Sequence, residues 1–232
     1  MPLDGAILGE GIYQPSEAAR LIGVKAQDVL RWTRGTAQIQ PIWKAHYQFI
    51  DDTTEISFAD LVELRVVRSL RSKGISLQAI RFAVDLAQSA FGIDRPLSSV
   101  AFKNDGREIL MDAIEKDGQL VSLSKNRPTQ KVFKQIISQS VSGLEYDGKT
   151  LQRWRPTIAR HVVIDPQRAF GTPVIDKVGI STKVIFREWE RFKNYKTVSQ
   201  IYEVDETLVK DAVQYEDKLN HFPGLNSGQG SF

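Results

Sequence analysis

The chain has 232 residues, of which 41% are hydrophobic and 25% are charged, and its formal net charge is +3. These values are ordinary for a folded soluble protein of one large or two modest domains. The absence of cysteine excludes disulfides, cysteine nucleophiles and thiolate metal sites, and the three histidines are too scattered to suggest a metal cluster. We therefore expect no cofactor and no metal.

Neither a membrane span nor a signal peptide is expected. No window approaches the roughly 18 consecutive apolar residues that cross a bilayer, and the first residues lack the order of a signal peptide. The expected compartment is the cytoplasm, without membrane contact. Because the net charge is small, any nucleic-acid contact depends on local clusters of arginine and lysine.

Residues 14–35 are predicted to form two short helices that meet at Gly23. Pro15 suits a first helical turn, and Gly23 and Gly35 suit the two helix ends. We assign Trp32 to the core, since large aromatic side chains usually pack. The solvent-facing side of the second helix carries Lys25, Arg31 and Arg34.

Residues 47–58 alternate apolar side chains with turn formers, which predicts a small hairpin, or wing. Ser57 and Asp60 match a capping box that begins the next helix, and Ser76 caps another helix after Gly74. Residues 11–91 are therefore predicted to be mostly helical.

Residues 96–157 are predicted to be rich in strands. Hairpin signals stand at residues 104–106 and 116–118, and a further turn at Asp147-Gly148. The strand-like apolar residues are Val100, Phe102, Ile109, Met111, Leu120 and Leu123. One helix, capped by Thr129, interrupts the strands.

The C-terminal part is predicted to contain a buried strand at 162–164, a rigid loop with Gly171 and Pro173, and three helices. These helices cover residues 182–192, 197–203 and 206–219.

The predicted fold class is α+β and mostly helical. It has an N-terminal winged helix-turn-helix, a small antiparallel β-rich middle section, and a C-terminal helical module similar to a helix-turn-helix. The predicted limits of these three parts are 1–92, 93–157 and 158–219, and residues 220–232 are expected to be a flexible tail.

The run Glu17-Ala18-Ala19-Arg20-Leu21-Ile22-Gly23-Val24, followed by Leu30-Arg31-Trp32, resembles the opening of MerR-like DNA-binding domains. Residues 56–61 and 74–81 extend the similarity, which covers about residues 11–90. The sequence departs from the MerR-like pattern at Gln14 and Lys25, where a Ser or Thr cap is usual. The resemblance favours groove reading by the second helix over a merely solvated face. The predicted DNA-contacting residues are Lys25, Gln27, Arg31, Arg34, Lys44 and Tyr47.

Residues 163–166, 170–175, 197–202 and 209–216 resemble the VapB-type antitoxin family, once known only as a domain of unknown function. Members resemble small helix-turn-helix proteins encoded beside PIN-like ribonuclease toxins. The resemblance implies a type II antitoxin that is not an enzyme, represses its own operator, and neutralises a PIN-like toxin by direct binding.

Two other functions stay open. One is a MerR-like one-component regulator whose middle section senses a small ligand. The other is an enzyme, which is weakly supported because the chain lacks P-loop, G-x-G-x-x-G, G-x-S-x-G and H-E-x-x-H patterns. The mixture of cations and aromatics at 187–196 suits phosphate contact, but the sequence alone favours an amphipathic helix end.

A homodimer is predicted, because paired half-sites supply the contacts that one short recognition helix lacks. Its expected surface is the apolar face of residues 61–70 or of residues 206–219. Toxin binding is assigned to residues 182–232, with Phe222 and Leu225 of the tail ordering on the partner.

Overall fold

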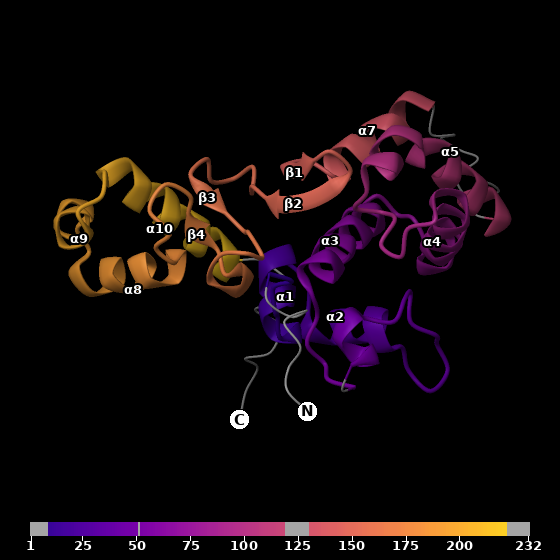
Figure 1. The fold of residues 1–232 in the computed structure, drawn as a ribbon, viewed down its shortest axis with the longest axis horizontal. Helices are drawn as coiled ribbons and strands as arrows, with labels where there is room; N and C mark the ends of the chain where they lie inside the picture. The colour runs from indigo at the N-terminus through magenta and orange to yellow at the C-terminus, as the bar shows by residue number, and fades with distance from the viewer. Residues whose placement is uncertain (1–8, 51, 119–129, 222–232) are drawn as a thin grey trace.

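The computed structural model describes residues 9–50, 52–118 and 130–221. It is mostly helical and elongated, with α8, α9 and α10 at one end and α4, α5 and α7 at the other (Figure 1). The elements in chain order are α1 (Pro15–Ile22), α2 (Ala26–Arg34), η2 (His46–Phe49), α3 (Phe58–Ser72), α4 (Leu77–Phe91), α5 (Val100–Lys116), α7 (Gln130–Ser140), β1 (Leu144–Asp147), β2 (Thr150–Trp154), β3 (Val162–Val163), η3 (Ala169–Gly171), β4 (Val174–Ile175), α8 (Thr182–Phe192), α9 (Tyr195–Tyr202) and α10 (Glu206–Asn220).

The predicted helix boundaries at 14–35 and at Ser57 are confirmed. Gly23 ends α1 in the left-handed region at φ 70°, and Ser57 and Asp60 form both hydrogen bonds of the capping box. Gln14 and Lys25 precede α1 and α2 without any side-chain cap bond, as the departure from the MerR-like pattern indicates. The first turns of these two helices are therefore uncapped by side chains.

The predicted hairpin wing is wrong. Tyr47 lies in the 3₁₀ helix η2, and Ile56 exchanges backbone hydrogen bonds of 3.0 and 2.9 Å with Tyr13, a residue that precedes α1. The apolar residues of 47–58 do not share one buried side: Phe49 and Ile50 are exposed, whereas Tyr47 is buried and its hydroxyl donates to the Gly11 carbonyl at 2.7 Å. The tertiary contact with residues 11–13 replaces the local pairing.

The predicted strands around residues 100–118 are also wrong, because this segment is the helix α5. Ser99 caps it, accepting from the Phe102 N–H at 3.0 Å, and Phe102, Leu110 and Ile114 are fully buried at helical spacing. The supposed turn glycine Gly106 is buried inside the helix, where a Cβ would come within 2.7 Å of the Phe102 ring. Leu120, Leu123 and Thr129 lie outside the described residues.

Two short antiparallel pairs account for the strands. The predicted hairpin at Asp147-Gly148 joins β1 to β2, and β3 pairs with β4 through Val162 and Ile175. An isolated bridge between Trp154 and Ile164 links the two pairs. The β content of the middle section is therefore confined to the end that leads into the C-terminal module.

Buried apolar side chains form two clusters. The larger runs from α1 through α7 and the strands, and it includes Tyr215 and Leu219 of α10, whereas the smaller joins α8, α9 and α10 around Ile185 and Val209. Leu61, Leu64, Val67 and Leu70 of α3 are 0% exposed, and the apolar side of α10 is buried as well. The surfaces predicted for dimer contact are thus used inside one chain, so a dimer needs another surface.

Polar contacts fasten α1 to the C-terminal module. Arg20 of α1 forms an ion pair with Glu216 of α10, which is 1% exposed and also accepts a hydrogen bond from Thr182. The Lys183 ammonium of α8 donates to both oxygens of Glu17, at 2.7 and 2.8 Å. In Figure 1, α1 lies between the two ends of the molecule.

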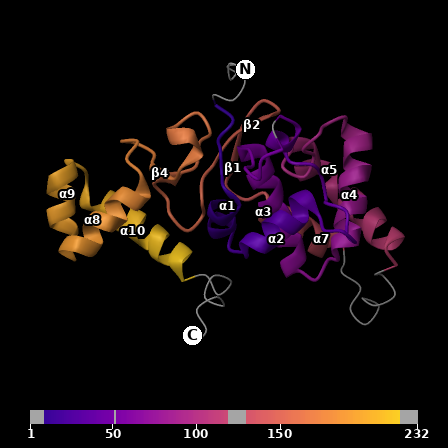
Figure 2. The same cartoon turned by 90° about the horizontal axis from the view of Figure 1, so that it is seen from below.

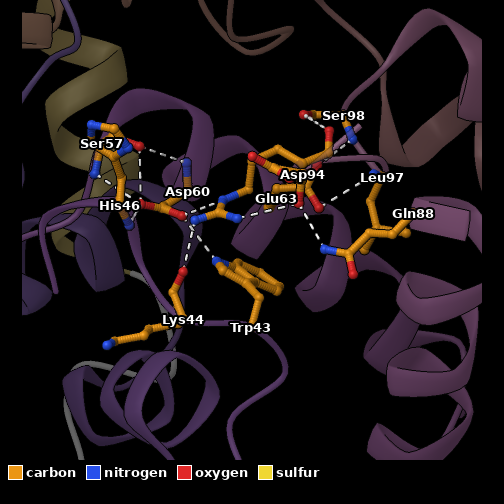
Figure 3. A network of polar contacts seen from close by, with 11 residues as sticks. Trp43, Lys44, His46, Ser57, Asp60, Glu63, Gln88, Asp94, Leu97 and Ser98 are labelled. Carbon is orange, nitrogen blue, oxygen red and sulfur yellow. Dashed lines mark hydrogen bonds and ion pairs between the residues drawn. The ribbon is translucent and has the colours of Figure 1, made fainter. Parts of the chain in front are cut away.

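A second polar network holds two loops against α3 (Figure 3). The fully buried Asp60 carboxylate accepts from the Trp43 indole at 2.9 Å, the Arg95 Nε at 2.6 Å, the His46 N–H at 2.9 Å, and both the N–H and the hydroxyl of Ser57. One turn later, the Glu63 carboxylate accepts from the backbone N–H groups of Leu97 and Ser98.

Glu63 gives the fold a testable pH dependence. Burial raises the pKa of its carboxyl from 4.5 to about 7, although the Ser98 hydrogen bonds and Arg95 act in the opposite direction. The folded chain therefore keeps a proton that the unfolded chain releases, and stability should fall by up to roughly 3 kcal/mol as pH rises from about 4.5 to 7. Urea unfolding of wild type and Glu63→Gln across this window measures the effect. A stability difference between them that stays constant with pH would contradict it.

The junction between α1 and α10 gives a second prediction. Glu216→Ala should lower the free energy of unfolding by roughly 3 kcal/mol, because the largely buried Arg20 loses its counter-charge. Glu206→Ala removes an exposed (i, i+4) partner of Lys210 and should cost less than about 0.5 kcal/mol. Chemical denaturation of both variants checks the contrast, and equal losses would show that the buried pair has no special role.

Candidate nucleic-acid interface

Helix α2 separates a buried side from an exposed side. Val29, Trp32 and Thr33 are at most 4% exposed, and the Thr33 hydroxyl donates to the Val29 carbonyl at 2.9 Å. Lys25 and Gln27, by contrast, are exposed. The assignment of Trp32 to the core is confirmed, and three of the predicted DNA-contacting residues, Lys25, Gln27 and Arg31, are exposed.

The two arginines of α2 carry acidic partners. Arg31 pairs with Asp28 at 2.6 Å on the exposed side of the helix. Arg34 pairs with Asp52 at 2.7 Å and also donates to the Thr53 carbonyl at 2.8 Å. Arg34 therefore ties the end of α2 to the segment before α3, while Arg31 is free to exchange a weak surface partner for a phosphate.

The loop after α2 is held close to the helix. Gly35 ends α2 at φ 75°, and a Cβ there would collide with the Ile39 carbonyl. The Ile42 N–H donates to the Trp32 carbonyl at 2.7 Å, and Arg81 of α4 donates to the Gln40 carbonyl at 2.7 Å. Arg81 is a positioning residue that the sequence analysis missed, because its partners are backbone carbonyls 40 residues away.

Lys44 and Tyr47 differ in exposure to solvent. Lys44 is exposed, with its ammonium 4.5 Å from the centre of the Phe49 ring. Tyr47 is 5% exposed, its hydroxyl is engaged by Gly11, and burial raises its pKa to about 12. We therefore remove Tyr47 from the proposed DNA surface and read it as a core residue.

A cavity of about 670 Å³ opens beside the Asp60 network. Its walls include Trp43, Phe49 and Ile50, and its rim carries charges of both signs from Lys44 and Asp94, among others. Arg95 also lines the cavity, and its guanidinium donates to the Asp60 carboxylate at 2.6 Å and to the Lys44 carbonyl at 2.8 Å. The cavity lies between the start of α3, the segment that precedes it and the loop after α4, and Asp94 and Arg95 of its lining belong to the predicted middle section.

A second group of cations lies on α8 and α9. Lys193 stands 4.4 Å over the Trp189 ring, which stacks on Tyr195 at 5.7 Å, and Arg191 stands 5.1 Å from the Phe192 ring. Residues 182–192 are helical as predicted, and the cations gather around the end of α8 and the start of α9.

Neither a metal-binding cluster nor a membrane-spanning helix is found in the part of the chain that the structure describes. That part contains no group of three or more His, Asp or Glu side chains placed to hold a metal ion. None of its helices combines the length and apolar character needed to cross a membrane. Phe222 and Leu225, the predicted toxin-binding residues, lie outside the described residues.

Comparisons with known proteins cover almost the whole chain. No family model matches it. A Mycobacterium tuberculosis protein named "Putative antitoxin VapB45" is 25% identical over 221 residues, covering 87% of this chain and 92% of that protein. The crystal structure of Rv2018 from Mycobacterium tuberculosis matches with a TM-score of 0.68 at 22% identity, covering 87% of this chain and 96% of that one. The second similarity shows a shared fold, and the first supports an antitoxin family for this chain.

Proposed function

We propose that this chain is the antitoxin of a type II toxin–antitoxin system, which represses its own operator and neutralises a PIN-like ribonuclease by direct binding. The similarity to the VapB45 protein over nearly the full length of both chains carries this proposal. An antitoxin acts by binding and needs no catalytic residue.

DNA binding is assigned to α1 and α2 as a MerR-like helix-turn-helix. The exposed side of α2 presents Lys25, Gln27 and Arg31, the turn at Gly23 sets the angle between the helices, and Lys44 follows on the next segment. Long cations suit phosphates, whereas Gln27 and Arg31 suit base edges in the major groove. A symmetric homodimer would place two copies of α2 on paired half-sites.

The charges of α2 predict that removing an arginine and removing an acid have opposite effects on DNA binding. Arg31→Ala and Arg34→Ala should each weaken binding by roughly 1–3 kcal/mol, whereas Asp28→Asn should strengthen it, because Asp28 repels phosphates and competes for Arg31. Fluorescence anisotropy with a duplex from upstream of the gene measures the affinities.

Lys116→Ala, on the distant α5, is the matched control and should bind like wild type. Thermal melting of every variant separates loss of contact from loss of fold, above all for Arg34, which also holds Asp52 and Thr53. Wild-type affinity in all three α2 variants would remove α2 from DNA binding.

Toxin neutralisation is assigned to residues 182–232. A truncation directly after Lys218 would be an unsuitable test, because it would remove Leu219, which is 1% exposed within the larger core. A cut after His221 removes the tail and leaves α10 whole.

Deleting residues 222–232 should leave the melting temperature and DNA affinity unchanged and weaken the complex with the neighbouring ribonuclease about tenfold or more. A buried Phe or Leu contributes about 1.5–3 kcal/mol, and Phe222 and Leu225 are the expected anchors. Calorimetry with the deletion and with Phe222→Ala/Leu225→Ala tests this. Unchanged toxin affinity in both would move the masking surface to the folded helices.

Ligand sensing by a one-component regulator is the second candidate, and the cavity beside Asp60 is the observation that favours it. Its volume falls in the usual range for small-molecule sites. A toxin reading frame directly beside this gene distinguishes the two candidates, since a ligand-sensing regulator needs none.

A further inference from the structure

Positive charge in the C-terminal module is concentrated on α8 and α9. Residues 182–200 contain five cations and two acidic residues, whereas the remaining residues of 161–232 contain four cations and eight acidic residues. The five cations are Lys183, Arg187, Arg191, Lys193 and Lys196. The module therefore has a positive side along α8 and α9, while α10 and the loops carry the negative charge.

Most of these cations lack an acidic partner within the described residues. Arg187, Lys193 and Lys196 form no ion pair there, and Arg191 approaches Glu188 only to 4.0 Å. On α1 and α2, by contrast, each arginine pairs with a carboxylate. Cations without a partner can bind an anionic surface without first breaking an ion pair. The cations of α8 and α9 should therefore attract such a surface more strongly than the paired arginines of α1 and α2 do.

Aromatic rings support the same cations. Trp189 carries the Lys193 ammonium on its face and stacks on Tyr195, while Phe192 is 40% exposed beside Arg191. Rings that interleave with long cations are typical of surfaces that follow a nucleic-acid backbone. An amphipathic helix end accounts for Trp189 and Tyr195, which pack on the smaller core, but not for the exposed Phe192 and Arg187.

The cations of α8 and α9 and the helix α2 lie on either side of α1. Figures 1 and 2 agree that α8 and α2 lie at the same level of the molecule with α1 between them. The ion pairs Lys183–Glu17 and Arg20–Glu216 fix α8 and α10 to α1. A duplex bound to α2 that runs past α1 would meet α8, which these ion pairs join to α1.

We propose that Arg187, Arg191, Lys193 and Lys196 form a second DNA contact, the α8–α9 patch, which binds backbone phosphates beside the site read by α2 and without sequence preference. The inference rests on the proposed function, because it needs a duplex on α2. Phosphate contacts position a protein on DNA, and base contacts specify the site.

The test compares charge removal from the two sides of the module. Arg187→Gln/Lys196→Gln removes two patch cations, and Lys210→Gln/Lys218→Gln removes two exposed cations from α10 as the matched control. Both are titrated by anisotropy, between about 50 and 200 mM salt, against the upstream duplex and a scrambled one. The slope of log affinity against log salt should become shallower by about 2 for the patch variant on both duplexes, since each lost phosphate contact removes about 0.9. The control should keep the wild-type slope.

The outcomes separate this inference from the proposed function. Wild-type protein that binds neither duplex would refute DNA binding as a whole. If Arg31→Ala weakens binding but the patch variant keeps the wild-type slope, the inference alone is wrong. If the patch variant keeps its DNA slope and loses the ribonuclease complex, the patch is instead a surface for an acidic protein, which also overturns it.

Discussion

The Asp60 carboxylate is the contact on which the N-terminal half depends. It lies at the first turn of α3, is fully buried, and accepts hydrogen bonds from Trp43, His46, Ser57 and Arg95. These donors come from the segment before α3, from its cap and from the loop after α4. A buried carboxylate is stable only when such donors surround it, so one side chain fixes the relative positions of three segments.

Those positions matter for both surfaces described above. Asp60 binds Trp43 and His46, and Lys44 lies between these two residues in the chain. The same segment continues from the loop after α2, which Gly35 and Arg81 hold against that helix. Arg95, bound to Asp60, forms one wall of the cavity. A ligand in that cavity and a duplex on α2 would therefore act on the same segment.

Local signals in the sequence were reliable where the local structure is autonomous. Ser57-x-x-Asp60, Ser76, Gly23 and the Asp147-Gly148 turn all have the predicted roles, because caps and tight turns are formed by neighbours in the chain. The turn predicted at Asn104-Asp105-Gly106 is wrong, because the packing of Phe102 and Leu110 in the core outweighs the turn preference of these residues. The pairing of Ile56 with Tyr13 has no local signal at all.

The candidate site shows the same division. Helical spacing placed Lys25, Arg31 and Arg34 on one solvent-facing side; Lys25 and Arg31 are exposed, whereas Arg34 is partly buried. Spacing could not show that Tyr47 turns inward, that Arg34 is held by Asp52, or that Arg81 supports the loop, since these contacts join distant segments. That Arg187 and Lys196 form no ion pair with the described residues likewise depends on how α8 and α9 pack.

The position of α1 has a consequence for how this architecture can change. One side of α1 completes the N-terminal core, and its polar side receives Glu216 and Lys183 from the other end of the chain. The hydroxyl of Tyr13, just before α1, donates to the Gly171 carbonyl at 2.9 Å. Even a methyl side chain at position 171 would collide with the Tyr13 hydroxyl. A C-terminal half taken from another protein would thus have to supply an acid for Arg20, a cation for Glu17 and a glycine for Tyr13. The two halves are therefore expected to be inherited and exchanged together, as a single recombination unit, although the smaller apolar core lies wholly within the C-terminal half.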